Sequence, residues 1–397
     1  MAKSHKSLQQ WLNKLETSHN KKIDLGLTRV KTVYDNLKLE KVAPTIITVA
    51  GTNGKGSTVA ILTSIIKQSG IKVGAFTSPH LVRFNERICI DNQEVSDKDI
   101  VAAFELIENH LNGVTLSYFE YATLAALIIF KQNKIDVAVL EVGLGGRLDS
   151  VNVVDADCAI ITTVDIDHTE WLGNDIESIA LEKAGIMREN KPVIYGDTDC
   201  PLTIIQHADD TGAQLILPDY PQQSFVTNLK GTYQQKNITT AITALNTLDL
   251  LITENNIKQA LVNVVLKGRL QVIAKDPVVI LDVSHNHQAA IELSQWLDNN
   301  RIDGKTIAVF SVLNDKKVSQ WLPLFKGNVD VWCVSEVKSH RTMKLNELVR
   351  FLADTATLIT SYPEIKQAYK GAHLMANKND RLLVFGSFYT VSEVLAG

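Results

Sequence analysis

Seven residues near the start of the chain, GTNGKGS at 51–57, have the types and spacing of a loop that binds phosphate. The three glycines let the backbone turn sharply, so that several N–H groups can point at one oxyanion. Lys55 can reach the β- and γ-phosphates of a nucleotide, and Ser57 can approach Mg²⁺ or phosphate at the start of a following helix. We therefore predict that Mg-ATP binds at Gly51, Thr52, Asn53, Gly54, Lys55, Gly56 and Ser57.

The loop departs from a standard Walker A motif in two ways. Two residues rather than four separate Gly51 from Gly54, and Gly56 lies between the lysine and the serine. An ordinary glycine-rich turn is the alternative. Three glycines with a lysine and a serine between a predicted strand and a predicted helix favour phosphate binding.

Three polar side chains, Glu141, His168 and Ser78, each come at the end of an apolar run or shortly after one. Ligands of an open α/β sheet bind beyond the carboxyl ends of its strands, where these residues would lie. A carboxylate near a γ-phosphate requires a cation between them, so we expect Glu141 to bind Mg²⁺ with the other two contributing. Taken singly, each residue has an ordinary alternative: a helix-capping Glu, a hydrogen-bonded His and a turn Ser.

Apolar, β-branched runs alternate with amphipathic helical segments along most of the chain, which predicts an α/β fold with a mostly parallel sheet. We expect the first part to be a P-loop NTPase-like domain. Its expected strands are residues 45–50, 73–76, 137–142, 159–164 and 192–195, with helices after residue 55 and at 178–187.

A second series of strands and helices begins near Val278 and predicts a smaller, Rossmann-like α/β domain. We place the first domain at 1–268 and the second at 269–397, with a hinge near 267–277 because this segment contains Gly268, Lys275, Asp276 and Pro277. The expected strands of the second domain are 278–283, 306–310, 329–334, 357–360 and 382–385, and its helices are 289–297, 345–353 and 365–375.

The composition is that of a globular enzyme and argues against several other classes of protein. The 397 residues predict two domains, and the formal net charge of −4 comes with no basic block for nucleic acid. No apolar run reaches membrane-spanning length. The polar start is unlike a secretory signal and the four cysteines are scattered, so we expect a cytoplasmic protein.

Several longer motifs resemble bacterial folylpolyglutamate synthase/dihydrofolate synthase, a family within the wider group of Mur-type ligases. The resemblance extends from IDLG at 23–26 to the last predicted strand. Its motifs are GTNGKGS at 51–57, TSPHL at 77–81, ERI at 86–88, YFEYAT at 118–123, LEVGLGGRLDSVN at 140–152, DHTEWLG at 167–173, EKAGI at 182–186, GR at 268–269, DVSHN at 282–286 and GSFYT at 386–390.

The resemblance implies an ATP-dependent carbon–nitrogen ligase. Such an enzyme joins L-glutamate to dihydropteroate, giving dihydrofolate, and to the γ-carboxylate of reduced folates, through an acyl phosphate and with release of ADP and phosphate. The IDLG and YFEYAT segments resemble the bifunctional enzymes, so we expect both acceptors and, by default, a monomer. The alternatives are a single-activity folylpolyglutamate synthase, a Mur-type ligase with another acid substrate, a P-loop kinase or NTPase, and a catalytically silent nucleotide-binding module.

The family pattern also implies cofactors. Ser78 and Glu141 match the ligands of one Mg²⁺, and His168 matches a residue that helps to bind a second. Lys183, whose sequence context alone predicts a solvated helix lysine, matches a lysine that is carbamylated to N6-carboxylysine. A carbamate would be an anionic oxygen ligand where an ammonium would repel Mg²⁺. The resemblance thus makes Lys55, Lys183 and His168 the catalytic candidates and leaves room for a monovalent cation.

Other positions match family contacts to substrates. Asn237, Arg269 and Asp282 match ATP contacts, and His285 and Ser387 are candidates for glutamate, although His285 could equally cap a helix. The pterin/folate region is matched by Asp24, Leu25, Gly26, Ser117, Tyr118, Phe119, Glu120, Leu148, Asp149 and Ser150. Two departures fall in DVSHN: Ser284 stands where the family more often has Ala, and His287 stands where it often has Pro. The second change removes a rigid turn and adds a titratable group.

Overall fold

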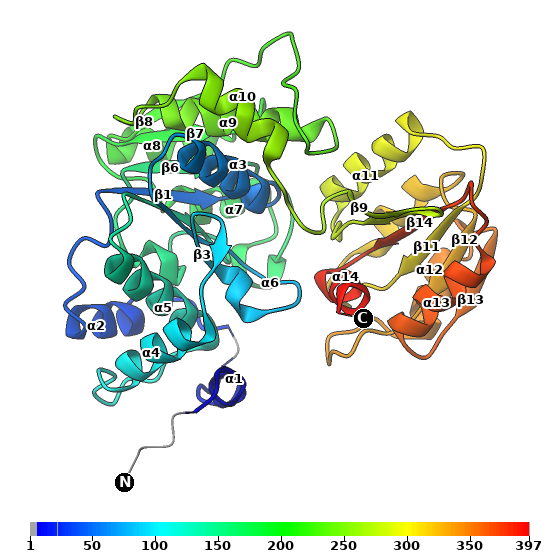
Figure 1. Ribbon diagram of the computed structural model, residues 1–397, viewed down its shortest axis with the longest axis horizontal. Helices are drawn as coiled ribbons and strands as arrows, with labels where there is room; N and C mark the ends of the chain where they lie inside the picture. The colour runs from blue at the N-terminus through cyan, green and yellow to red at the C-terminus, as the bar shows by residue number, and fades with distance from the viewer. Residues whose placement is uncertain (1–5, 22, 397) are drawn as a thin grey trace. The chain divides into compact units, whose positions relative to one another are not determined.

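The computed structural model describes residues 6–21 and 23–396, and the chain divides into two compact units. Figure 1 shows an α/β arrangement in each of them. The first unit comprises residues up to 226 together with 235–264, and the second comprises residues 227–234 together with 265 onward. The last crossing between the units therefore lies at 264, four residues before the predicted boundary, and the short segment 227–234 was not expected in the second unit.

Eight strands form the sheet of the first unit, in the order β4-β3-β2-β5-β1-β6-β7-β8. All neighbours from β2 to β8 are parallel, whereas β3 and β4 add an antiparallel edge. The mostly parallel sheet that the sequence predicted is thus confirmed. The strands are β1 (Thr45–Ala50), β2 (Val73–Phe76), β3 (Ile88–Ile90), β4 (Gln93–Glu94), β5 (Val137–Glu141), β6 (Cys158–Ile161), β7 (Pro192–Tyr195) and β8 (Gln214–Ile216).

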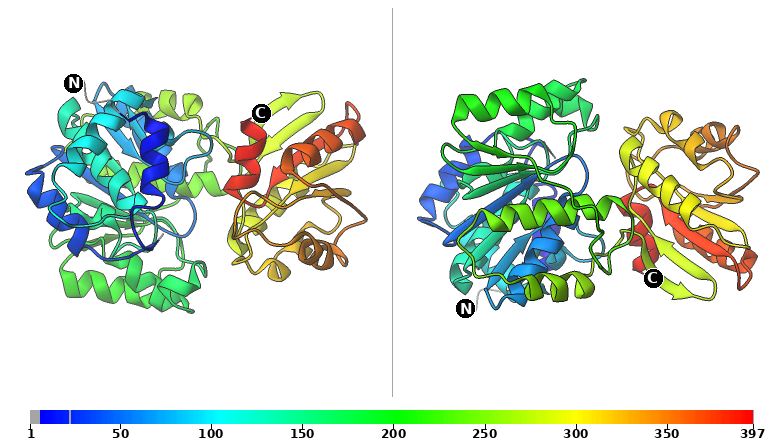
Figure 2. Two further views of the ribbon diagram at one scale, coloured as in Figure 1. Left: turned by 90° about the horizontal axis from the view of Figure 1, so that it is seen from below. Right: turned by 90° about the horizontal axis from the view of Figure 1, so that it is seen from above.

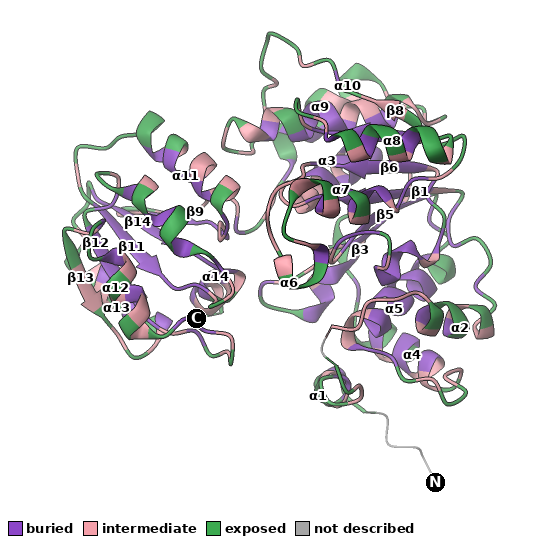
Figure 3. Cartoon of the chain, turned by 180° about the vertical axis from the view of Figure 1, so that it is seen from behind, coloured by how far each residue is buried: buried purple, intermediate pink, exposed green. Residues whose placement is uncertain are grey.

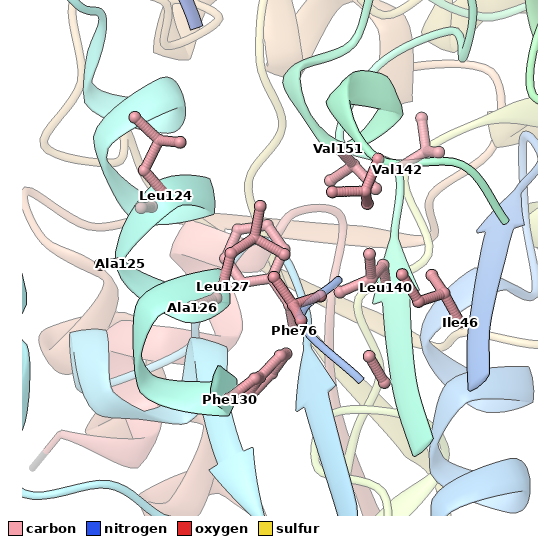
Figure 4. Packing of buried hydrophobic residues seen from close by; sticks show 14 of the residues in the cluster. Ile46, Phe76, Leu124, Ala125, Ala126, Leu127, Phe130, Leu140, Val142 and Val151 are labelled. Atoms are coloured by element: carbon pink, nitrogen blue, oxygen red, sulfur yellow. The ribbon is translucent and has the colours of Figure 1, made fainter. Parts of the chain in front are cut away.

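Both faces of this sheet are covered, which explains why its strands are continuous apolar runs rather than alternating ones. Ile46 and Leu140 pack with Leu127 and Phe130 of helix α5 (Tyr118–Asn133) on one face, as Figure 4 shows. Ile47 and its neighbours on the other face are fully buried as well. Figure 3 shows buried strands beneath helices whose outer faces are exposed.

Several helices of the first unit begin after a residue whose side chain caps them or after a glycine. Ser117 caps α5, with Glu120 completing a capping box, and Gly54 precedes α3 in a left-handed conformation that glycine adopts without strain. The helices are α1 (Leu8–Leu15), α2 (Thr28–Asn36), α3 (Lys55–Gln68), α4 (Asp97–Glu108), α5, α6 (Thr169–Leu172), α7 (Ile176–Ala184), α8 (Leu202–Thr211), α9 (Tyr233–Asn246) and α10 (Glu254–Asn263), with 3-10 turns η1 (Phe84–Arg87) and η2 (Ser150–Val153).

The second unit contains a six-stranded sheet in the order β13-β12-β11-β14-β10-β9, parallel except for β9. Its strands are β9 (Gln271–Lys275), β10 (Val278–Leu281), β11 (Thr306–Phe310), β12 (Val331–Val334), β13 (Leu358–Ser361) and β14 (Arg381–Phe385). The predicted hinge segment 267–277 therefore differs from the structure. Five of its eleven residues form the edge strand β9, which pairs antiparallel with β10 inside this unit.

Aromatic side chains build the core of the second sheet on one face. Phe310, Phe325, Trp332 and Phe385 pack with centroid separations of 4.9–6.3 Å. Helices α11 (His287–Asn299) and α12 (Leu345–Leu352) contribute to this cluster. Further views show helices on both sides of the sheet (Figure 2). The remaining elements are α13 (Ile365–Met375), α14 (Phe388–Leu395), η3 (Val318–Gln320) and η4 (Leu322–Phe325).

Candidate active site

The glycine-rich loop joins the central strand β1 to α3, as the sequence predicted. Gly51 has φ +147°, and a Cβ atom there would lie 1.9 Å from Oγ1 of Thr162, so only glycine fits. The Lys55 ammonium donates to the carbonyl oxygens of Gly51 (2.7 Å) and Thr52 (3.2 Å) of its own loop. The loop therefore places a cation among backbone groups at a helix N-terminus, which suits a polyphosphate.

A polar segment after β6 braces this loop. The backbone N–H of Thr52 donates to the Thr163 carbonyl (2.9 Å), and that of Asn53 donates to the Thr163 hydroxyl (3.1 Å). The Thr52 hydroxyl donates to the carbonyl of Asp165 at 3.1 Å. The strand β6 ends at Ile161 rather than at Val164, the predicted end, because the next residues hydrogen-bond to the loop. In the sequence, the two consecutive threonines Thr162 and Thr163 at the end of an apolar run could have indicated that this segment supports the loop.

Asn237 of α9 also lies against the loop. A Cβ atom at Gly54 would come within 2.6 Å of the Asn237 side-chain oxygen, and Asn237 is buried. The structure thus brings together this residue and the loop, 180 positions apart in sequence, inside the first unit.

Glu141 and Ser78 are also brought together. Strands β5 and β2 are neighbours, so their carboxyl ends meet, and the backbone N–H of Ser78 donates to Oε2 of Glu141 at 3.0 Å. The carboxylate is buried, and both of its oxygens lie 3.9 Å from the place where a Cβ atom of Gly56 would be. A buried carboxylate beside the phosphate loop is the placement that the metal prediction required.

The donor set fits a magnesium ion that arrives with nucleotide. Among residues 6–21 and 23–396, no three His, Cys, Asp or Glu side chains cluster as a metal site. Mg²⁺ bound with a nucleotide typically takes one or two protein oxygens and completes its shell with phosphate and water. Glu141 and the Ser78 hydroxyl are such oxygens.

Lys183 is not the solvated lysine that its sequence context predicted. It lies in α7 with only 3% of its surface exposed. Burial, together with the nearby charge of Lys55, lowers the pKa of Lys183 to about 7, against the opposing effect of Asp167. The neutral amine is therefore well populated near neutral pH, and it lies close enough to Lys55 and Asp167 to sense their charges.

His168 immediately precedes α6 in a left-handed conformation, with φ +52°. Its backbone N–H donates to the carboxylate of Asp167 at 2.8 Å. Asp167, which the sequence analysis did not single out, thus holds the backbone of His168 and influences Lys183.

The three segments assigned to pterin or folate lie side by side. The backbone N–H of Gly26 donates to the carbonyl of Leu148 at 3.0 Å, and the Ser150 hydroxyl lies 2.7 Å from that of Thr123, which follows the Ser117–Glu120 segment. Tyr118 and Phe119 occupy the first turn of α5. The arrangement unites residues separated by more than a hundred positions.

Asp149 organises the loop after β5. Its carboxylate accepts hydrogen bonds from the backbone N–H groups of Gly143 (3.1 Å), Leu144 (2.9 Å) and Val151 (2.9 Å). Burial nevertheless raises the pKa of Asp149 to about 6, with these hydrogen bonds opposing the rise. Its side chain is thus engaged in holding the loop on which Leu148 and Ser150 also lie.

The candidates of the second unit also form one group. The Asp282 carboxylate accepts hydrogen bonds from the backbone N–H groups of Leu270 and Ser284, both at 2.8 Å, and from the Ser284 hydroxyl. The Arg269 guanidinium lies 5.2 Å from the centroid of the Phe388 ring, and the His285 ring lies 5.9 Å from it. The extra hydroxyl of Ser284 is thus tied to Asp282.

The helix caps near this group show which residues begin α11 and α14. The cap of α11 is Asn286, so the alternative that His285 caps a helix is wrong. The Nδ1 atom of His285 lies 2.7 Å from the Val283 carbonyl oxygen. His287 is the first residue of α11, a position where proline is well tolerated, so its backbone remains helical without the proline ring. Ser387 is buried and caps α14 through the Thr390 N–H at 3.1 Å.

Comparisons with known proteins agree with this geometry. Residues 49–273 match the Mur ligase middle domain, and residues 268–388 match the Mur ligase glutamate ligase domain. The dihydrofolate synthase/folylpolyglutamate synthase of Escherichia coli K12 is 41% identical over 98% of this chain and 94% of its own length. The chain belongs to the dihydrofolate synthase/folylpolyglutamate synthase family.

Solved structures of this family share the fold over nearly the whole chain. E. coli FolC in complex with DHPP and ADP has a TM-score of 0.93 and 39% identity, covering 98% of this chain and 97% of its own. The bifunctional folylpolyglutamate synthase/dihydrofolate synthase of Yersinia pestis, complexed with AMPPNP and Mn, has a TM-score of 0.91 and 39% identity, covering 98% of each chain. The family and the fold class predicted from the sequence are therefore confirmed.

Within the part of the chain that the structure describes, no helix is both long and apolar enough to cross a bilayer.

Proposed function

We propose that this protein joins L-glutamate to dihydropteroate, and to the γ-carboxylate of reduced folates, at the expense of Mg-ATP. One observation carries the proposal: the phosphate loop after β1 and the buried Glu141 at the end of β5 lie at the same edge of one parallel sheet. The relatives support the substrates, because E. coli FolC holds DHPP and ADP, and a bifunctional relative holds Mn, AMPPNP and L-glutamate.

The reaction needs no nucleophile from the protein. A carboxylate oxygen of the acceptor attacks the γ-phosphorus, and the bond to the β-phosphate oxygen breaks, giving an acyl phosphate and ADP. The amine of glutamate then attacks the acyl carbon, phosphate leaves with that carboxylate oxygen, and the amine loses a proton. Lys55 offsets charge on the transferring group, and the backbone N–H groups of the loop orient it.

Glu141 and Ser78 would hold Mg²⁺, with His168 and a carbamylated Lys183 completing a second site. The ions, when bound, neutralise phosphate charge. The support for carbamylation is the buried amine with a pKa near 7, because only a neutral amine adds CO₂. Asn237, Arg269 and Asp282 would contact ATP, and His285 and Ser387 would face glutamate. We also propose that the protein binds a monovalent cation, that it is a monomer and that it works in the cytoplasm.

The test is ATP-dependent incorporation of labelled glutamate, with dihydropteroate and a reduced folate monoglutamate offered separately. We expect incorporation with both acceptors, accompanied by ADP, and none without ATP. Incorporation with only the folate would leave a single-activity synthase. ATP hydrolysis without incorporation into either acceptor would overturn the proposal in favour of another Mur-type ligase or an NTPase.

A further inference from the structure

Three segments distant in sequence, 24–26, 117–120 and 148–150, are joined pairwise by polar contacts. Gly26 bonds to Leu148 through the backbone, as described above. Arg29 joins the first segment to the second, and Thr123 joins the second to the third. Neither Arg29 nor Thr123 was a candidate from the sequence, and each connects two of the three segments.

Arg29 of α2 bridges two acids. Its Nη1 lies 2.9 Å from Oδ2 of Asp24, and its Nη2 lies 3.1 Å from Oε1 of Glu120 and donates to the Asp24 carbonyl. The Glu120 side chain is 4% exposed and that of Arg29 is 26% exposed, so the pair joins a buried carboxylate to a partly buried guanidinium. The planar guanidinium can serve both acids at once, which a lysine ammonium cannot do with the same geometry.

Thr123 of α5 makes the other connection through a buried hydroxyl. The hydroxyl donates to the Phe119 carbonyl at 3.0 Å, which leaves it as the acceptor for Ser150 Oγ at 2.7 Å. Both residues are at most 5% exposed, so loss of either hydroxyl would leave a buried polar group without its partner. The contact fixes the start of η2 against the first turn of α5.

The second of these segments also contacts the end of β5. A Cβ atom at Gly143 would lie 2.6 Å from the Phe119 ring, so the ring rests directly on the backbone two residues after Glu141. The ring is also 5.7 Å from that of Phe76, at the end of β2. The three segments are therefore held in register with the strand ends that carry Glu141 and Ser78.

We propose that Arg29 and Thr123 are positioning residues for the acceptor: they fix the three segments so that the acceptor's carboxylate is aligned with the γ-phosphate. Neither residue acts on the reacting atoms. The inference rests on the proposed function and adds to it the residues that set acceptor affinity independently of ATP.

The test uses two pairs of variants in the full-length protein. Thr123→Val removes the hydroxyl and keeps the shape, whereas Thr123→Ser keeps the hydroxyl. Arg29→Lys keeps the charge and loses the fork, and Lys14→Gln is its control, because Lys14 makes an ion pair with Glu108 in the same N-terminal region. The KM values for dihydropteroate and ATP are measured for each.

We expect Thr123→Val and Arg29→Lys to raise the KM for dihydropteroate by roughly fivefold to tenfold, the cost of an unpaired buried polar group. The KM for ATP should stay within about twofold of wild type, as in the Lys14→Gln control, and Thr123→Ser should restore the acceptor KM. An unchanged acceptor KM in both variants, or equal rises in both KM values, would overturn the inference while leaving the proposed function standing. No incorporation by the wild type would instead overturn both.

Discussion

The backbone N–H of Ser78 donates to the carboxylate of Glu141 across 3.0 Å, linking the ends of neighbouring strands β2 and β5. The hydrogen bond orients a buried carboxylate beside the phosphate loop. A carboxylate in this position would cost free energy next to phosphate unless a cation were bound.

Glu141→Gln should keep the side-chain volume and remove the charge that we propose binds the cation. We expect kcat/KM to fall by at least about a hundredfold, since a metal ion supplies several kcal/mol of charge stabilisation. Initial rates over a magnesium series measure this, with Glu177→Gln as the control because Glu177 is an exposed acid that bonds to the Thr203 N–H. Wild-type kcat/KM in Glu141→Gln would contradict the metal assignment.

Lys183 should carry a carbamate. Because only the neutral amine adds CO₂ and the pKa of Lys183 is about 7, the carbamate fraction should increase as the pH rises through 7. With ¹³C-labelled bicarbonate, NMR should show a carbamate signal that is absent from Lys183→Met. A signal that persists in that variant would place the modification elsewhere.

The raised pKa of Asp149 should make the free energy of unfolding depend on pH. Its folded pKa is about 6 and the ordinary value is 3.8, so between these pH values the folded state binds more protons than the unfolded state. This group therefore lowers the free energy of unfolding as the pH rises from about 4 to about 6, by on the order of 2 kcal/mol.

The comparison is with Asp149→Asn, which cannot titrate. Denaturant unfolding of both proteins between pH 4 and pH 7 isolates the contribution, because all other groups are shared. We expect the stability difference between wild type and variant to change over this range. A difference that is constant with pH would contradict the raised pKa.

Gly51→Ala should disable the phosphate loop. The new methyl group would collide with Thr162, in addition to the strain of a positive φ. Gly113→Ala is the matched control, because Gly113 has φ +85° and nothing lies within 4 Å of its Cβ position. We expect nucleotide binding, measured by calorimetry, to weaken by more than about tenfold in the first variant only. Equal affinities in the two variants would show that the contact with Thr162 is unimportant.

Much of the fold was readable from the sequence, because strands buried on both faces are uniform apolar runs. β1, β2, β7 and β11 begin and end where predicted. The short strands β3 and β4 were not predicted, since three and two residues carry no periodic signal. The segment of β9 was interpreted as a hinge because of its glycine, proline and charged residues. Its strand pattern is weak, since Val272 and Ile273 are neighbours in sequence and both are exposed on an edge strand.

The site was predictable where glycines or strand ends mark it, and less so where a role depends on tertiary contacts. Glu141 and the phosphate loop follow strands, so topology places them. The burial of Lys183 depends on packing of α7 that its neighbours in sequence do not reveal. Arg29 and Thr123 resemble ordinary helix residues, and only their distant partners distinguish them.

The most direct test of the central claim follows the oxygen of the acceptor. Dihydropteroate labelled with ¹⁸O in its carboxylate is incubated with ATP, magnesium and L-glutamate, and the released phosphate is analysed by mass spectrometry. The account predicts one ¹⁸O in each phosphate released, because the acceptor carboxylate attacks the γ-phosphorus and leaves that oxygen behind. Unlabelled phosphate, with all the label retained in dihydropteroate, would show that the nucleotide is hydrolysed without activating the acceptor and would contradict the ligase mechanism.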